Sequence, residues 1–165
     1  MADIPSTPAD GNVKVVIVTT IANTSAPTAA ELNAGSAVDV SCYLTGDGWN
    51  PSLDEATIAD PRLCETETFE QPGRKQRALT VTYIDNTNTA SANAAKTALV
   101  PGTALFAVVR RGIAFDTTFA AAQKVDVYPI KPGAYNPLAP EANSVLKISQ
   151  KLFVTGRTIP DATVA

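Results

Sequence analysis

The chain has 165 residues, enough for one domain with a substantial hydrophobic core, and 45% of them are hydrophobic, which excludes a fully disordered protein. Charged residues make up only 18%, below the roughly 25% typical of soluble domains. We therefore expect much of the surface to contact copies of the same chain. The alternative is a weakly charged monomer, which would have the same composition. The net charge of −3 provides no overall electrostatic attraction for nucleic acid.

The N-terminal part of the chain predicts a short arm, a strand and a helix. Residues 1–12 are polar and contain prolines, which indicates a flexible N-terminal arm. Val13–Thr20 is rich in Val, Ile and Thr, as expected for a strand. Thr28 and Glu31 have the spacing of a capping box, and Gly35 is placed to end a short helix in the left-handed conformation.

A second strand and a long loop are expected next. Val38–Leu44 alternates like a strand, and the turn residues of Thr45–Pro51 are expected to stop it. Residues 46–75 show little periodicity and are longer than most loops of compact domains, so we interpret them as an interaction loop rather than a solvated insertion or a further hairpin. Its scattered apolar residues are the candidate inter-subunit anchors: Trp49, Leu53, Ile58, Leu63 and Phe69.

The middle of the chain predicts a two-faced strand followed by a helix. Gln76–Asp85 alternates cleanly, with Leu79, Val81 and Tyr83 on the face expected to be buried and Thr80 and Thr82 on the polar face. Ser91–Val100 is rich in alanine, and we expect a helix capped by Ser91.

The last third completes a mainly β architecture. Strands are expected at Ala104–Arg110 and Lys124–Ile130, with a helical turn at Asp116–Ala122 between them. In the final strand, Leu146, Ile148 and Leu152 are expected to face the core, and residues 158–165 to form a C-terminal arm ordered only on assembly. Six strands with one or two short peripheral helices predict a single domain with a β-sandwich or barrel-like fold.

Motifs for chemistry are missing from the sequence. The chain has no histidine, so Ser-His and Cys-His nucleophiles are excluded, and it has neither a phosphate-binding loop nor a GxGxxG turn. The carboxylates between Asp54 and Glu70 have no regular spacing and are typical of a solvated acidic face rather than of a calcium loop. We therefore expect no enzyme, no catalytic residue, no metal and no cofactor.

Location signals are also missing. The N-terminus has no basic region followed by an apolar stretch, and no apolar run approaches the roughly 20 residues that span a bilayer. We expect a soluble protein made inside a cell, with no membrane partner. Cys42 alternates in phase with Val38 and Val40, which predicts a buried core residue, and a disulfide with Cys64 is not expected.

Five segments occur in an order that resembles the major tail tube proteins of long-tailed bacteriophages (siphoviruses) of actinobacteria: Pro27–Gly35, Thr68–Arg74, Val108–Thr117, Val125–Pro129 and Glu141–Gly156. The resemblance runs from about Lys14 to the end of the chain. It implies a β-sandwich subunit of the tail tube fold that closes into hexameric rings. It also implies that the rings stack into a hollow tube around a tape-measure protein and later pass the genome.

The resemblance carries expectations about partners and surfaces. The partners would be copies of the chain, the tape-measure protein, the tail terminator and distal tail proteins, with double-stranded DNA passing without specific binding. The location would be the virion tail, after assembly in the host cytoplasm. Because a DNA conduit should repel phosphate, we expect polar sheet faces to line it, with Thr80, Thr82 and Asp126 as candidates and the basic Lys147 and Lys151 less suited.

Two other classes of function remain open at this stage. A head-decoration or head–tail joining protein of a virion would share the low charge and the lack of catalytic motifs. A host β-domain that binds a small ligand or a saccharide needs an aromatic-lined concave site, and one tryptophan with 6% aromatic residues supplies little material for it.

Overall fold

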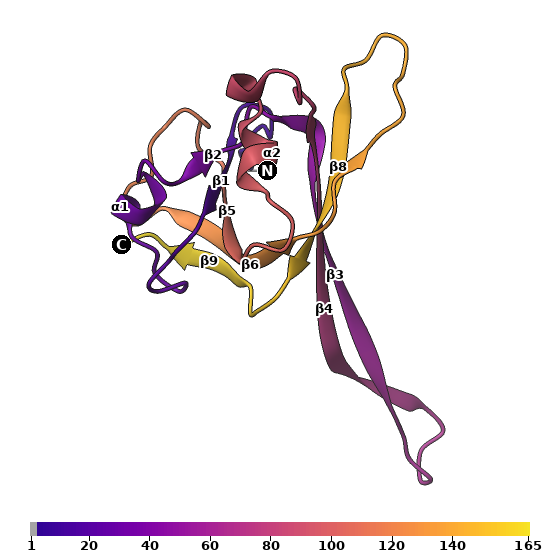
Figure 1. The fold of residues 1–165 in the computed structure, drawn as a ribbon. Coiled ribbons are helices and arrows are strands. Elements are labelled where there is room, and N and C mark those ends of the chain that lie inside the picture. Colours follow the sequence, from indigo (N-terminus) through magenta and orange to yellow (C-terminus); the bar gives the residue numbers. More distant parts are fainter. Residues whose placement is uncertain (1–2) are drawn as a thin grey trace.

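The structure of the chain is a computed structural model that describes residues 3–165 (Figure 1). It is mainly β, as the sequence predicts, and the antiparallel strands follow the order β2-β1-β5-β6-β8-β4-β3, with β7 paired to β8 and β9 paired to β6. The strands are β1 (Val13–Val18), β2 (Val38–Asp39), β3 (Leu44–Pro61), β4 (Thr68–Ile84), β5 (Leu105–Arg111), β6 (Lys124–Pro132), β7 (Asn136–Pro137), β8 (Lys147–Val154) and β9 (Ile159–Thr163). The helices are α1 (Ala29–Leu32) and α2 (Ala94–Ala98), with a 3-10 turn at Ala90–Ala92.

The sheet curls around the first of two apolar clusters. Leu79, Val81 and Tyr83 of β4 are buried there, as are Ile148 and Leu152 of β8, so the predicted phase of both strands is confirmed. Ala95 and Leu99, in and just after α2, belong to the same cluster. Leu146 was predicted to join it, but it precedes β8 and is exposed, so that prediction is wrong.

The second cluster lies on the opposite face of β1, β5 and β6. Val16 and Val108 point into it from the sheet, and Leu32 of α1 packs there with Phe119. Alternate residues of β1 and β5 thus enter different clusters, and both faces of these strands are covered. This explains why their sequences are nearly continuous apolar runs rather than alternating ones.

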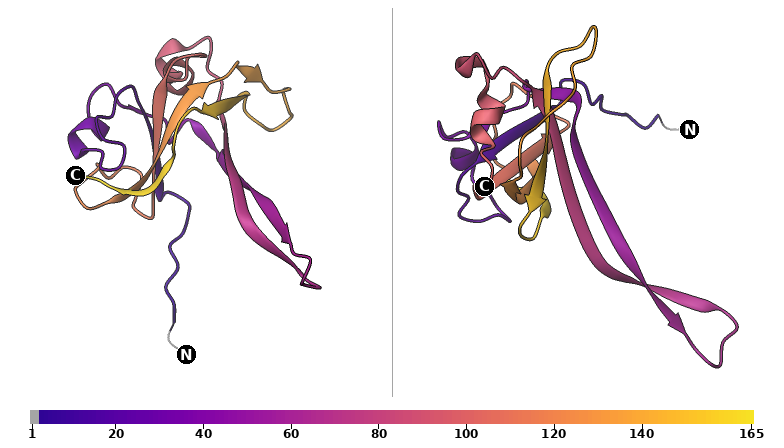
Figure 2. Two further views of the ribbon diagram at one scale, coloured as in Figure 1. Left: turned by 90° about the horizontal axis from the view of Figure 1, so that it is seen from below. Right: turned by 45° about the vertical axis from the view of Figure 1, so that its right-hand side comes forward.

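The most prominent feature outside the body is a β-hairpin made by β3 and β4 (Figures 1 and 2). The prediction of a loop over residues 46–75 is therefore wrong. The inner part of β4, Leu79–Ile84, pairs with both β8 and β3, whereas its outer part pairs with β3 alone. We call residues 53–77 the arm, and none of its side chains is buried. Apolar alternation is missing there because the isolated chain gives the arm no buried face.

The turn expected at Thr45–Pro51 is an irregularity within β3 and does not end the strand. The register shifts between Leu44 and Trp49, and Gly48 is buried where the two strands approach closely. A Cβ atom on Gly48 would lie 2.1 Å from the carbonyl oxygen of Thr82, so only glycine fits without moving β4. The irregularity lets β3 leave the body and continue into the arm.

The second predicted strand is shorter than expected. β2 ends at Asp39, because the Asp39 carboxylate accepts hydrogen bonds from the backbone N–H and the hydroxyl of Ser41, and a tight turn follows. The backbone N–H groups of Tyr43 and Leu44 both donate to the Val40 carbonyl. This turn breaks the alternation, so Cys42 is exposed and its predicted core position is wrong.

The two helices agree with the sequence in part. The capping box of α1 is confirmed: the Thr28 hydroxyl accepts from the Glu31 N–H, and the Glu31 carboxylate accepts from the Thr28 N–H. Gly35 does not end the helix in the left-handed conformation, because Asn33 is the C-cap. The helix predicted over Ser91–Val100 is confined to α2, whose N-cap residue is Asn93 rather than Ser91.

The ends of the described chain behave differently. Residues 158–165 are not an arm, since β9 pairs with β6 and both Ala162 and Val164 are buried in the second cluster. Residues 3–8 have no regular secondary structure, are exposed and extend away from the body (Figure 2). Met1 and Ala2, the start of the predicted N-terminal arm, lie outside the described residues.

Candidate functional site

The five predicted inter-subunit residues divide into two groups. Trp49 lies at the root of the hairpin, half-buried, with its ring edge-on to Tyr128 at 5.8 Å, so it packs on its own subunit. The other four lie on the arm and are exposed: Leu53, Ile58, Leu63 and Phe69. The pairing Ile58↔Gln71 and Asp60↔Phe69 places Ile58 and Phe69 diagonally on one face, where they form an exposed apolar pair.

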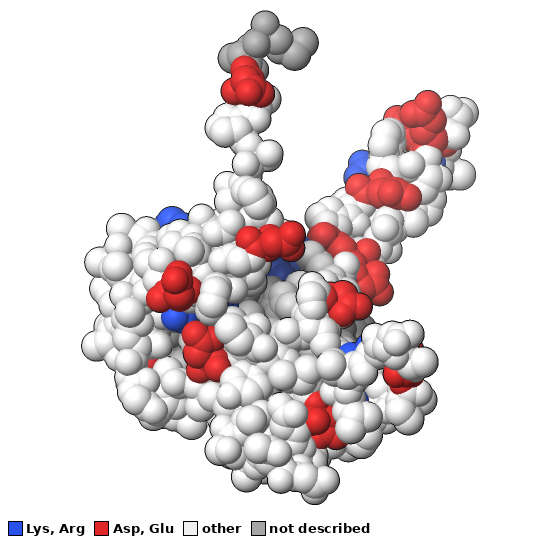
Figure 3. Space-filling view, turned by 90° about the horizontal axis from the view of Figure 1, so that it is seen from above, with Lys and Arg blue, Asp and Glu red and all other residues white. Residues whose placement is uncertain are grey.

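The end of the arm is acidic. Residues 60–70 hold four carboxylates and one guanidinium, a net charge of −3, which equals the net charge of the whole chain. Asp60 accepts a hydrogen bond from Arg62 at 2.9 Å, whereas Glu65, Glu67 and Glu70 are exposed and unpaired within residues 3–165. Figure 3 shows acidic side chains on the projecting arm and few basic ones on the face in view. The arm end is therefore a negatively charged surface.

The candidate channel residues do not lie on one face. Thr80 and Thr82 are half-buried on β4, where they pair with Lys151 and Ser149 of β8 and continue a polar face. Asp126 lies on β6 and is 7% exposed. Its carboxylate accepts from Arg111 at 2.8 Å and from the Asp161 N–H at 2.9 Å, so its charge is already compensated and its position does not support a channel-lining role.

A basic cleft lies where the arm joins the body. Lys75 and Arg77 at the base of the arm, Lys151 of β8 and Arg157 before β9 line a cavity of about 650 Å³ with no acidic lining residue. Lys75 pairs with Glu55 at 3.4 Å, and within residues 3–165 the other three have no ion-pair partner. Lys75 and Arg77 are distant in the sequence from Lys151 and Arg157, so sequence reasoning missed the cleft. The pairing of β4 with β8 brings the two pairs together.

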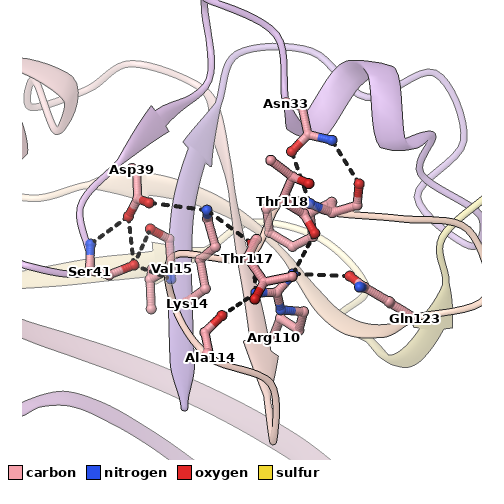
Figure 4. Close-up of polar contacts among 11 residues, drawn as sticks. Lys14, Val15, Asn33, Asp39, Ser41, Arg110, Ala114, Thr117, Thr118 and Gln123 are labelled. Atoms are coloured by element: carbon pink, nitrogen blue, oxygen red, sulfur yellow. Dashed lines mark hydrogen bonds and ion pairs between the residues drawn. The ribbon is translucent and has the colours of Figure 1, made fainter. Parts of the chain in front are cut away.

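A buried arginine supports the fold rather than a reaction. Arg110 is fully buried and stacks on Phe119, 4.9 Å from the ring centre. It donates to the carbonyls of Ala114, Thr117 and Thr118 and to Gln123 Oε1, at 2.8–3.1 Å (Figure 4). Burial lowers its pKa. The carbonyls turn inward around the guanidinium, so the helical turn predicted at Asp116–Ala122 is wrong, and the segment is a loop.

Side chains for other chemistry are not gathered anywhere in the described part of the chain. Residues 3–165 contain no cluster of three His, Cys, Asp or Glu side chains suited to a metal ion. Neither helix within this range has the length and apolar character needed to cross a bilayer. The arm, its acidic end and the basic cleft are therefore the surfaces on which a function has to be argued.

Comparison with known proteins decides the family. A model of the family described as "Phage tail tube protein" matches residues 1–165. The chain belongs to this family. Tail tube proteins are structural rather than enzymatic, so the chain is a structural subunit of a virion tail. A search of curated proteins finds no match.

A solved structure shares the fold of this tail tube protein. It is a chain of the anti-feeding prophage (AFP) baseplate, determined by cryo-electron microscopy and 6-fold symmetrised. The two chains are 10% identical, with a TM-score of 0.55 over 96% of this chain and 98% of the other. At this identity the likeness concerns the fold alone, and it extends over nearly the whole of both chains.

Proposed function

We propose that this tail tube protein builds the tail of a siphovirus whose host is an actinobacterium. Six copies close into a ring, and rings stack into a hollow tube around a tape-measure protein. The tail terminator and distal tail proteins cap the tube, assembly takes place in the host cytoplasm, and the finished tube conducts the genome. The five ordered segments that resemble tube proteins of such phages support this proposal, as does a fold shared with a baseplate chain that was symmetrised 6-fold.

The observation that carries the proposal is the arm. A two-stranded ribbon alone in water is marginally stable at best, and this one exposes Ile58, Leu63 and Phe69 without burying any side chain. The outer edge of β3 also has no strand partner within residues 3–165, because β3 ends the order of the sheet. Neighbouring subunits remove both liabilities, since they cover apolar side chains and occupy open edges. The arm is therefore an assembly element.

The channel is proposed to be lined by the polar face of β4 that carries Thr80 and Thr82. Short uncharged side chains give passing DNA no fixed cation to hold it. The alternate residues Leu79 and Val81 are buried in the core and are not available to such a wall.

Native mass spectrometry and negative-stain electron microscopy of the purified chain test the proposal. Over a range of protein and salt concentrations we expect hexamers and stacked tubes of constant width. Stable monomers under every condition, or closed trimers that never stack, would overturn it.

A further inference from the structure

We infer that the basic cleft is the docking site for the acidic arm end of a second copy. The inference rests on the proposed self-assembly and names the contact by which one subunit holds the next. The cleft is lined by Lys75, Arg77, Lys151 and Arg157, and the arm end is residues 60–70.

Charge complementarity identifies the occupant. The arm end has a net charge of −3 and projects from the body (Figure 1), and its Glu65, Glu67 and Glu70 are exposed and have no ion-pair partner within residues 3–165. The cleft offers the opposite surplus, because three of its four cations have no ion-pair partner within residues 3–165. Guanidinium groups hold carboxylates through paired, charge-assisted hydrogen bonds, which suits Arg77 and Arg157 to the glutamates of the arm.

The cleft also contains a hydrogen-bonding group that lacks a partner. Thr158 lines it and is 7% exposed, and its buried hydroxyl makes no hydrogen bond to any described residue. Buried hydroxyls are normally paired, so this one has an unused hydrogen bond at the wall of the cleft. An apolar match accompanies the polar one, since Phe153 lies half-exposed in the cleft and Leu63 is fully exposed at the arm end.

The occupant comes from another copy because a chain cannot fill its own cleft. The strand from Leu53 to Pro61 is extended and, at about 3.3 Å per residue, holds the arm end roughly 26 Å from the arm base. Lys75 and Arg77 belong to that base. Each copy therefore carries a donor arm and an acceptor cleft at separate places. This is a head-to-tail contact, which closes into rings or continues as a stack.

Docking would also remove uncovered positive charge from the face proposed to line the channel. Lys151 lies opposite Thr80 on the polar face proposed to line the channel. Uncovered cations there would bind DNA phosphates by releasing counterions and would retard the genome. A carboxylate-rich arm on the cleft neutralises them.

Charge reversal on each side tests the contact. Glu65→Lys with Glu67→Lys makes the arm end basic, and Lys151→Glu with Arg157→Glu removes the net positive charge of the cleft and places two carboxylates in it. All four side chains are exposed, so folding should be retained. Each double variant alone should lose sedimentable tubes. Mixing the two in equal amounts should restore them, because the lysines introduced into one arm then meet the glutamates introduced into the other cleft, and unchanged arms meet unchanged clefts. Lys124→Glu with Lys131→Glu has the same charge change as the cleft variant, uses exposed residues outside the cleft, and should assemble normally.

Cross-linking locates the contact with the charges unchanged. Cys64 lies exposed at the arm end, and Gly156 lines the cleft. In a Cys42→Ser background, Gly156→Cys should give an intermolecular disulfide with Cys64 under mild oxidation. Ser36→Cys, which is exposed in the segment after α1 and outside the cleft, should not.

The outcomes separate the inference from the proposed function. Normal tubes from both charge-reversed variants, with no disulfide between Cys64 and the thiol introduced by Gly156→Cys, overturn the inference and leave tube assembly intact. A wild-type chain that never assembles overturns both. Binding of a labelled DNA duplex to wild-type monomers that is lost in Lys151→Glu with Arg157→Glu, while that variant still forms tubes, would make the cleft a nucleic-acid site and also overturn the inference.

Discussion

Tyr83 of β4 donates a hydrogen bond of 2.9 Å to the side-chain oxygen of Gln150 on β8, inside the first apolar cluster. The amide nitrogen of Gln150 donates to the carbonyls of Leu99 and Gly133, at 3.0 and 2.8 Å. One buried amide therefore connects the strand that carries the arm, the end of α2 and the turn after β6.

The free energy of unfolding should fall by about 2–4 kcal/mol in Gln150→Leu, because the Tyr83 hydroxyl and two carbonyls lose their buried partner. Tyr83→Phe alone should cost about 1 kcal/mol. In a double-mutant cycle measured by urea unfolding, Tyr83→Phe should cost clearly less once Gln150 is leucine. Strict additivity of the two changes would show that the hydrogen bond contributes nothing to the free energy of unfolding.

Stability should decline at alkaline pH. Burial, with smaller contributions from Tyr135 and Asp85, raises the pKa of Tyr83, and burial also raises the pKa of Tyr128. Unfolded tyrosines release their protons near pH 10, so above about that pH the unfolded state binds fewer protons than the folded state and gains stability. The loss is at most about 1.4 kcal/mol per pH unit for each such tyrosine. Urea unfolding between pH 8 and 11.5 should show a shallower decline for Tyr83→Phe than for wild type; equal slopes would contradict the assignment.

Arg110→Lys should lower the free energy of unfolding by about 3 kcal/mol, because a lysine ammonium group cannot make all the hydrogen bonds that the guanidinium donates to three carbonyls and to Gln123. Hydrogen exchange of residues 112–123 should accelerate at the same time. The neighbour Arg111 is the matched control: its side chain is 66% exposed, so Arg111→Lys should change stability by less than about 1 kcal/mol. Similar effects of the two substitutions would refute a special role for Arg110.

Gly48→Ala should separate the strands at the root of the arm, since the new Cβ atom meets the Thr82 carbonyl oxygen at 2.1 Å. We expect a loss of about 1–3 kcal/mol in unfolding free energy. Gly46→Ala, with nothing within 4 Å of its Cβ position, should stay near wild type. Thermal unfolding of the two variants side by side decides this.

Truncating the arm should uncouple folding from assembly. Glu55 and Lys75 are direct cross-strand partners, so residues 56–74 can be replaced by Asn-Gly, which favours a tight hairpin turn. Circular dichroism and the unfolding midpoint should be close to wild type, because the arm buries no side chain. Sedimentation should detect no tubes. Tubes of normal length would mean that the arm is dispensable.

The sequence alone determined the body of this protein wherever local pattern and burial agree. The alternation of Leu79, Val81 and Tyr83, and of Ile148 and Leu152, predicted both the strands and the face each buries, because a period of two leaves one register that buries the apolar set. The capping box at Thr28 was equally readable, since both hydrogen bonds join residues three apart. Resemblance in five segments indicated the tail tube family, which the family match confirms.

Tertiary structure alone decided the features that hold no local pattern. The arm is a long hairpin although its residues lack apolar alternation, because its ladder is formed by backbone hydrogen bonds and neither face is buried within the subunit. Residues 158–165 contain β9, which pairs with an edge of β6. The sequence of residues 158–165 does not show that this edge is available. The basic cleft exists only because β4 pairs with β8, which brings Arg77 and Lys151 together although they lie far apart in the sequence. Charged residues form a site here because pairing between distant strands brings them together, and no spacing along the chain encodes that pairing.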